Sequence, residues 1–182
     1  NDGDKVCDPN PVIQQRVEEY AKVCKGTDQA PNDAEDRDGF QDDDGKPDPD
    51  NDGDKVCDPN PVIQRKLASY ASICKGQDVS PNEPEDRDGY ADHDGTPEPD
   101  NDRDGVCDPN PVIQKNLAKY AGVCKGKDRA PFLAEDRDGH QDDDGVPEPD
   151  NDGDGFCDDN PDIQNNLKAH AHVCRGKDQC TD

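Results

Sequence analysis

A repeat of fifty residues constrains this chain more than any other feature of its sequence. Residues 1–14 recur letter for letter as residues 51–64, and two cysteines recur in register in every unit. The units are residues 1–50, 51–100 and 101–150, followed by a partial fourth unit, residues 151–182. A fixed period of this length is typical of a linear array in which each unit contacts its neighbours. We therefore expect an elongated tandem-repeat rod.

The composition leaves little material for a hydrophobic core. Only 27% of the 182 residues are hydrophobic, Trp and Met are absent, and the formal net charge is −25. This charge repels nucleic acid and anionic membranes, so neither is an expected partner. No apolar run of about 18 residues occurs, which predicts that the chain does not insert into a membrane. The absence of Met predicts a piece of a longer protein.

Nine cysteines in so polar a chain predict disulfides and an oxidising compartment, either extracellular or periplasmic. Zinc is the competing interpretation, but no C-x-x-C pair occurs and the four histidines are scattered. Pairing within a unit is favoured, while pairing between units, such as Cys24 with Cys57, stays open because sequence alone does not fix connectivity. The cysteines in register are Cys7, Cys24, Cys57, Cys74, Cys107, Cys124, Cys157 and Cys174.

The first half of each unit predicts one short, disulfide-stapled α-helix. Asn10 and Pro11 are typical of an N-cap and a first helical residue, and Gly26 is typical of the residue after a helix end. Apolar residues at positions 13, 17, 20 and 24 share one helical face, which predicts a helix of about 14 residues. A disulfide across this segment stabilises it by roughly 3 kcal/mol in the chain-entropy model.

The second half of each unit is acidic and carries the candidate functional residues. Residues 35–58 contain 11 acidic and 3 basic residues, a net charge of −8. Composition alone favours a disordered linker. The spacing argues against that interpretation, because Asp recurs at alternate positions before a glycine, as in Asp36-x-Asp38-Gly39-x-x-Asp42. Calcium takes about six to eight oxygens, which alternate Asp side chains can supply from one curled loop, and glycine permits its left-handed turn.

Stretches such as NEPEDRDGYADHDGTPEPDNDRDGVCD resemble thrombospondin type 3 repeats, most closely those that precede the peptidoglycan-binding domain of bacterial OmpA-like proteins. The resemblance covers residues 33–58, 82–108 and 132–158, with a partial match at 1–8. It implies mostly irregular, calcium-wrapped loops and a spacer or adhesive stalk at the bacterial envelope.

Carried over by register, the implied calcium ligands form three full sets and one partial set. They are Asp2, Asp4 and Asp8; Asp36, Asp38, Asp42, Asp44, Asp48, Asp50, Asp52, Asp54 and Asp58; Asp86, Asp88, Asp92, Asp94, Glu98, Asp100, Asp102, Asp104 and Asp108; and Asp136, Asp138, Asp142, Asp144, Glu148, Asp150, Asp152, Asp154 and Asp158. We expect roughly two to three Ca²⁺ ions for each full acidic stretch, given the number of oxygens that each ion takes.

The chain departs from the resembled family in two ways. The helix is inserted, and Lys5 and Lys55 stand where the later units have glycine. Because a left-handed turn disfavours residues other than glycine, we expect weaker sites around Asp54 and Asp58.

The ninth cysteine, Cys180, has no counterpart in the other units. The resemblance implies a disulfide partner that lies beyond Asp182, about sixteen residues after Cys180. We therefore expect Cys180 to be unpaired in this fragment. A disulfide between two chains through Cys180 is the alternative.

These features predict a structural protein and not an enzyme, because Asp pairs that recur in every unit suit a set of metal ligands better than one active site. The expected function is a calcium-dependent rigid spacer outside the cytosol, at the cell surface or in the periplasm. A calcium-stabilised extracellular filament or adhesive fibre is the alternative, and calcium storage is a third. Expected partners are calcium, copies of the chain, and cell-surface or peptidoglycan components bound through domains outside this sequence.

Overall fold

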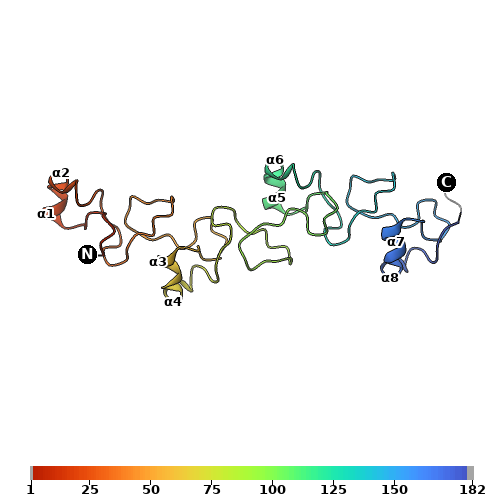
Figure 1. The fold of residues 1–182 in the computed structure, drawn as a ribbon, viewed down its shortest axis with the longest axis horizontal. Helices are drawn as coiled ribbons and strands as arrows, with labels where there is room; N and C mark the ends of the chain where they lie inside the picture. The colour runs from red at the N-terminus through yellow and green to blue at the C-terminus, as the bar shows by residue number, and fades with distance from the viewer. Residues whose placement is uncertain (1, 180–182) are drawn as a thin grey trace. The chain divides into compact units, whose positions relative to one another are not determined.

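The computed structural model describes residues 2–179, and the chain divides between Pro97 and Glu98 into two compact units. Each fifty-residue repeat contributes one pair of short helices, and the described residues contain no β-strand (Figure 1). The helices are α1 (Pro11–Gln14), α2 (Val17–Tyr20), α3 (Pro61–Gln64), α4 (Leu67–Tyr70), α5 (Pro111–Lys115), α6 (Leu117–Tyr120), α7 (Pro161–Asn165) and α8 (Leu167–His170).

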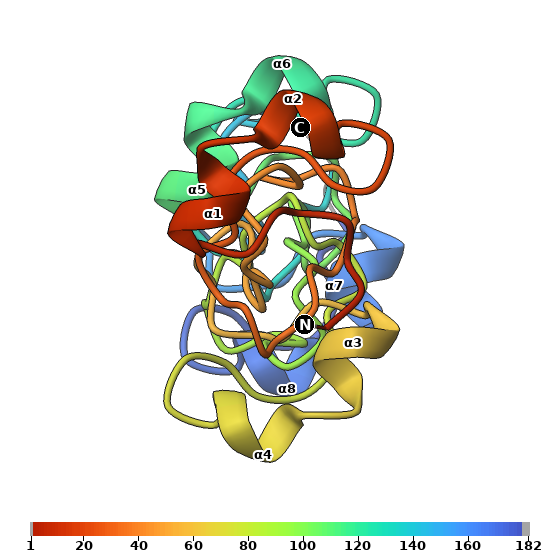
Figure 2. The same cartoon turned by 90° about the vertical axis from the view of Figure 1, so that its left-hand side faces the viewer.

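The prediction of one helix of about 14 residues is wrong, because each helix is broken after its first turn (Figure 2). Arg16 leaves the helical conformation at φ −130° and ψ 28°, and its N–H donates to the carbonyl of Ile13. A straight helix from residue 11 to residue 24 would be about 20 Å long. Residues 7–11 would then have to run fully extended along it, since the Cα atoms of Cys7 and Cys24 lie 5.0 Å apart. The break after the first turn shortens the distance between residues 11 and 24, so residues 7–11 can reach back to Cys24 without being fully extended.

The predicted helix start is confirmed in all four repeats. In the first repeat the Asn10 side chain accepts a hydrogen bond of 2.9 Å from the N–H of Val12, and Pro11 begins α1. Asn60, Asn110 and Asn160 cap α3, α5 and α7 in the same way. An N-cap of this kind satisfies one of the N–H groups that the first turn of a helix leaves unpaired.

Disulfides within each repeat are confirmed, and they form the centre of each small core. Cys7 pairs with Cys24, and the later repeats pair their cysteines at the same separation of 17 residues. In the third repeat, Ile113 and Tyr120 bury their side chains against the cysteines, with Leu117 partly buried beside them. Clusters of this size agree with the expectation of little hydrophobic core, and four disulfides indicate an oxidising compartment. Cys180 lies outside the described residues.

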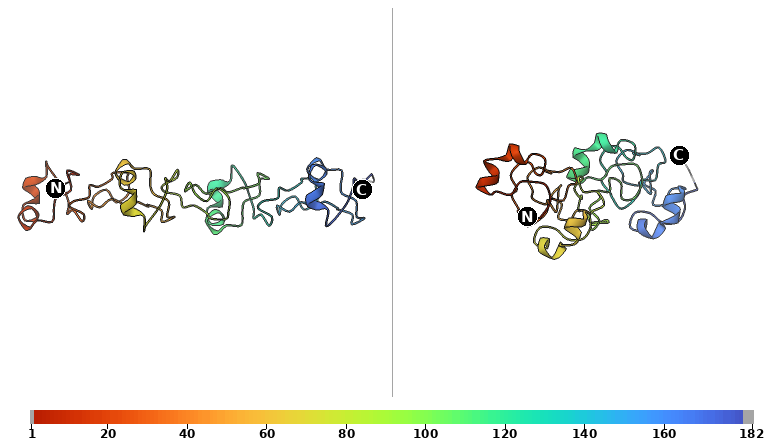
Figure 3. Two further views of the ribbon diagram at one scale, coloured as in Figure 1. Left: turned by 90° about the horizontal axis from the view of Figure 1, so that it is seen from below. Right: turned by 60° about the vertical axis from the view of Figure 1, so that its left-hand side comes forward.

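The chain after each helix pair consists of loops that are held by hydrogen bonds between distant backbone groups (Figure 3). The backbones of Val6 and Lys25 form an isolated parallel bridge, the second and third repeats have the equivalent bridge, and the fourth unit instead has a bridge between Cys157 and Lys177. The side-chain amide of Gln14 donates to the carbonyls of Cys7 and Asp8 at 3.1 and 2.9 Å. These bonds fix the start of each helix pair beside the acidic loop. No described helix exceeds five residues, and none is long and apolar enough to cross a membrane.

Candidate metal centres

The structure gathers alternate aspartates of each acidic loop into clusters that could hold a metal ion. Carboxylate oxygens of Asp50, Asp52 and Asp54 all lie within 4.8 Å of one another, and the same arrangement recurs fifty residues later at Asp100, Asp102 and Asp104. Asp54 and Asp104 are buried, each with 6% of its surface exposed. The spacing of Asp at every second position therefore brings three predicted ligands together in each of these loops.

A left-handed residue closes this loop in every repeat. Gly105 has φ 84° and Lys55 has φ 75°, and the N–H of each donates to the second carboxylate oxygen of the first aspartate in its loop, at 3.0 and 3.1 Å. Lys5 adopts the same conformation at φ 73°. The lysine therefore makes the turn that was expected to need glycine, and its effect on metal affinity stays a prediction.

The last aspartate of each cluster connects two acidic segments that are far apart in sequence. One oxygen of Asp54 accepts from the N–H of Val56 at 2.6 Å, and the other accepts from the N–H of Glu85 at 3.2 Å. The guanidinium of Arg87 donates to the backbone carbonyl of Asp54. Asp4 and Asp104 make equivalent contacts 31 and 33 residues along the chain. Each cluster is thus anchored to the loop that follows the next helix pair.

Asp28 belongs to a candidate centre, and Asp78 and Asp128 stand at the same position in the next two repeats, although none of the three was a predicted ligand. Asp78 is 1% exposed, and its Oδ1 accepts from the N–H of Ser80 at 2.7 Å. Its Oδ2 is buried and has no hydrogen-bond partner among the described residues, and the same holds for Oδ2 of Asp28 and Asp128. Asp28 lies in one cluster with Asp2 and Asp4. A buried carboxylate oxygen without a partner is costly unless the group is protonated or faces a cation, so this position could hold a metal ion.

Glycine is required where this aspartate meets the acidic loop. A Cβ atom on Gly45 would lie 2.6 Å from Oδ1 of Asp28, and Gly45 has φ 75°. Gly95 and Gly145 meet Asp78 and Asp128 in the same way. The glycine of the second D-x-D-G motif therefore permits both a left-handed turn and the close approach of a carboxylate.

Burial and neighbouring charge raise the pKa of these carboxyl groups. Loss of solvent, together with the nearby charges of Asp54, Asp52 and Asp50, raises the pKa of Asp78 to about 7. Burial likewise raises the pKa of Asp128 and of Asp58 to about 7. Burial causes most of each shift because it penalises the charged form, and the neighbouring carboxylates add to it.

A second kind of cluster joins Glu135, Asp136 and Glu148, whose carboxylate oxygens lie within 4.8 Å of one another. Glu135 and Asp136 are 4% and 3% exposed. Burial, followed by the hydrogen bond with Asp136, raises the pKa of Glu135 to about 7. Asp136 and Glu148 were predicted ligands, whereas Glu135 was not. In the first repeat the corresponding Glu35 is also buried, and its two carboxylate oxygens accept from the N–H groups of Asp36 and Gly45.

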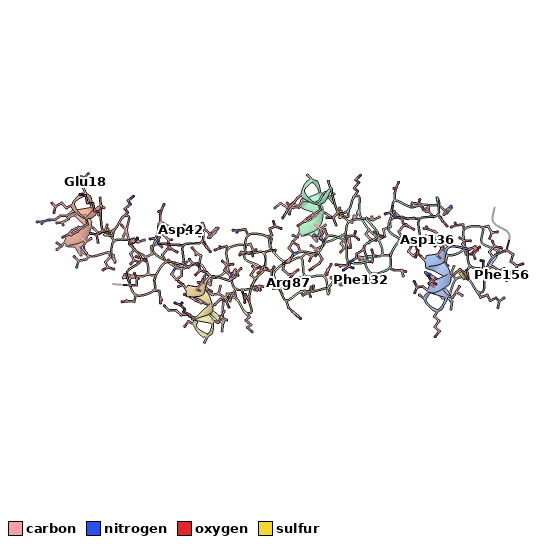
Figure 4. All side chains as sticks on the ribbon, in the orientation of Figure 1. Glu18, Asp42, Arg87, Phe132, Asp136 and Phe156 are labelled. Carbon is pink, nitrogen blue, oxygen red and sulfur yellow. A yellow bond between two sulfur atoms is a disulfide. The ribbon has the colours of Figure 1, made fainter. Side chains whose placement is uncertain are left out.

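Some predicted ligands instead fold their own loop. Oδ1 of Asp42 accepts from the N–H groups of Asp38 and Gly39, both at 3.1 Å, and Oδ1 of Asp38 accepts from Phe40 at 2.9 Å. Figure 4 places Asp42 and Asp136 on the loops that follow their helix pairs. The predicted ligands that bond the backbone within or near their own loop include Asp44, Asp88, Asp92, Asp94, Asp138, Asp142, Asp144, Asp150, Asp152, Asp154 and Asp158.

Two predicted ligands close the end of the acidic stretch. Asp58 and Asp108 are 1% and 0% exposed, and Oδ2 of Asp108 accepts from the N–H of Asn101 at 3.2 Å. The N–H of Asp58 donates to the carbonyl of Pro49 at 3.0 Å. These residues are buried beside the disulfide, within one residue of Cys57 and Cys107.

No protein family, curated protein or solved structure matches this chain.

Proposed function

We propose that this chain is a calcium-binding structural repeat, a spacer or stalk outside the cytosol whose fold depends on calcium. One observation carries the proposal. In three successive repeats, a buried aspartate has one carboxylate oxygen without a hydrogen-bond partner among the described residues, at Asp28, Asp78 and Asp128. A carboxylate in such a position is stable only when it is protonated or when it faces a cation.

The donor set favours calcium over a transition metal. The clusters consist of Asp and Glu oxygens, which hard cations prefer. All eight described cysteines are in disulfides and so are not available as thiolate ligands. Backbone N–H groups already occupy one oxygen of several aspartates, which leaves the other oxygen for an ion. A loose shell of this kind suits calcium better than magnesium, which demands near-ideal octahedral geometry.

A structural role is proposed because each ion would connect segments that are far apart in the sequence. Asp28 lies 24 residues beyond Asp4 in sequence, and Glu148 lies 12 residues beyond Asp136, yet each pair shares a cluster. The hydrophobic clusters contain only three or four buried residues each. Calcium would then hold each repeat together where apolar burial is too small to do so.

Calcium titration by calorimetry tests the proposal. Asp78→Asn keeps the size of the side chain but removes the charge, so it should abolish one site or weaken it at least about tenfold. Asp143→Asn removes the same charge from an exposed position and should leave every site unchanged. Absence of calcium binding by the unaltered chain would refute the proposal.

One observation favours the filament alternative. The position before the second cysteine carries an exposed aliphatic residue in every repeat, with Val23, Ile73, Val123 and Val173 exposed by 70, 50, 60 and 49%. Regularly repeated apolar residues on a surface favour association between chains. Electron microscopy and sedimentation in calcium test it, with serine at all four positions as the variant that should remain monomeric.

A further inference from the structure

Cationic side chains line a pocket in each of the first two repeats, although the chain as a whole is strongly acidic. In the second repeat the pocket has a volume of about 540 Å³ and its rim includes Lys55, Lys75 and Arg87. The first repeat has a pocket of about 600 Å³ with Lys5, Lys25 and Arg37 at the same positions.

The backbone brings these three cations together from three separate segments. The N–H of Lys75 donates to the carbonyl of Lys55 at 3.0 Å, next to the Cys57–Cys74 disulfide. The guanidinium of Arg87 donates to the carbonyl of Asp54, the residue before Lys55. Figure 4 labels Arg87 on the segment that follows α4. The disulfide and these hydrogen bonds therefore hold the backbones of the two lysines and the guanidinium of the arginine at one place.

Lysine occupies an unfavourable backbone conformation at this site. Lys5 and Lys55 have φ 73° and 75°, whereas the later repeats place Gly105 and Gly155 at the same position. The first side-chain carbon at this position lies beside the arginine, because a Cβ on Gly105 would lie 3.0 Å from a guanidinium nitrogen of Arg137. Glycine adopts this turn without strain, so a lysine held there beside the arginine points to a role in binding.

The pocket in the second repeat offers these cations little compensation. Neither Lys55 nor Lys75 has an ion-pair partner among the described residues. The one carboxylate in the lining, Asp92, accepts hydrogen bonds from the N–H groups of Asp88 and Gly89. His93 stands where the first repeat has Asp43. Val56 and Ile73 supply apolar surface between the charged groups.

We propose that these pockets bind an oxyanion group, a sulfate or carboxylate carried by a ligand, between the lysine of the metal loop, the lysine after the second cysteine, and the arginine. The anion accepts charge-assisted hydrogen bonds from all three side chains. The third repeat keeps Lys125 and Arg137 but has Gly105 and Gly122 in place of two lysines of the first pocket, so it lacks the complete site. Anion binding is therefore confined to the first two repeats.

Titration of the full chain with inorganic sulfate and with dextran sulfate, in calcium, tests the proposal. The double variant Lys5→Gly/Lys55→Gly should lower the affinity for sulfate groups by about tenfold or more. Lys5→Gln/Lys55→Gln should have the same effect, which separates loss of charge from relief of the backbone. Lys127→Gly removes one charge outside the pockets and should change nothing.

Gly105→Lys is the complementary variant, because it should create a third site and raise the measured stoichiometry by one. If inorganic sulfate binds, a single anionic group is sufficient as the ligand. If dextran sulfate binds but inorganic sulfate does not, the ligand must engage both pockets at once. The proposal is overturned if neither probe binds, or if both double variants bind as the unaltered chain does. Circular dichroism and the count of free thiols show whether each variant is folded.

Discussion

The side-chain amide of Asn60 donates a hydrogen bond to the backbone carbonyl of Asp36, 24 residues earlier in the chain. The same side chain accepts from the N–H of Val62 at 2.9 Å and so caps α3. Asn160 makes the equivalent pair of bonds to Asp136 and Asp162. One asparagine therefore begins a helix and also holds the acidic loop of the preceding repeat.

Asn60→Ser separates these two roles. Serine keeps the N-cap but cannot reach the carbonyl of Asp36, so the free energy of unfolding should fall by about 1 kcal/mol. Asn60→Ala removes both bonds and should cost roughly 2 kcal/mol. Asn10→Ser is the matched control, because Asn10 caps α1 but its side-chain amide has no acceptor among the described residues. Urea unfolding in saturating calcium measures all three, and equal losses for Asn10→Ser and Asn60→Ser would show that the bond to Asp36 contributes nothing.

The pH dependence of the metal-free chain follows from the raised pKa values. The carboxyls of Asp78 and Asp128 have folded-state pKa values of about 7, against 3.8 for the ordinary group. The folded state therefore binds protons more strongly than the unfolded state does. Their contribution to stability is complete below about pH 4 and is lost as the pH rises through about 7.

Metal-free protein should accordingly be more compact at pH 5 than at pH 8. Calcium reverses this direction, because the ion competes with protons for the same oxygens and binds more tightly as the pH rises. Small-angle scattering of dialysed protein at both pH values, with and without calcium, measures the effect. A radius that is the same in all four conditions contradicts it.

The sequence predicted the components of each repeat better than their geometry. Three predictions are confirmed: the cap at Asn10, the pairing of Cys7 with Cys24, and the left-handed glycines. Each of these features depends on residues within a single repeat. The straight helix was wrong because periodicity reports which face is apolar but not whether the axis is continuous. Its conflict with the disulfide could have been found by comparing the helix length with the reach of residues 7–11.

The missed aspartates show a different limit. Asp28, Asp78, Asp128 and Asp178 recur in register, so the repeat alone gave a signal for them. They lie outside the D-x-D-G runs, however, and only the folded chain brings Asp28 beside Gly45 and the Asp2–Asp4 pair. Ligands contributed by a segment across a helix pair cannot be recognised from spacing within one loop.

Lys55→Gly should strengthen the calcium site at Asp50, Asp52 and Asp54. The left-handed turn costs a residue with a Cβ about 1 kcal/mol, which corresponds to several-fold in affinity if the loop orders on binding. The substitution also removes a positive charge beside the bound cation. Calorimetry measures the change against the site at Asp100, Asp102 and Asp104, where Gly105 is already present. Unchanged or weaker calcium binding would show that Lys55 does not limit this loop.

Two glycines with nearly equal backbone conformations separate the effect of strain from the effect of crowding at the candidate centre. Gly53 has φ 81° and nothing within 4 Å of an added Cβ, so Gly53→Ala should cost only the strain of the turn, about 1 kcal/mol. Gly95 has φ 74°, and its added Cβ would collide with the carboxylate of Asp78. Because that carboxylate is buried and bonded to Ser80, it cannot move aside without losing its contacts. Gly95→Ala should therefore destabilise the chain by several kcal/mol and also lower calcium affinity, whereas Gly53→Ala should leave a folded chain.

The Asp78→Asn variant completes the comparison, since it weakens the same site without crowding the turn. Thermal unfolding with and without calcium measures each variant, and equal behaviour of the two alanine variants would place the Asp78 carboxylate outside the metal site.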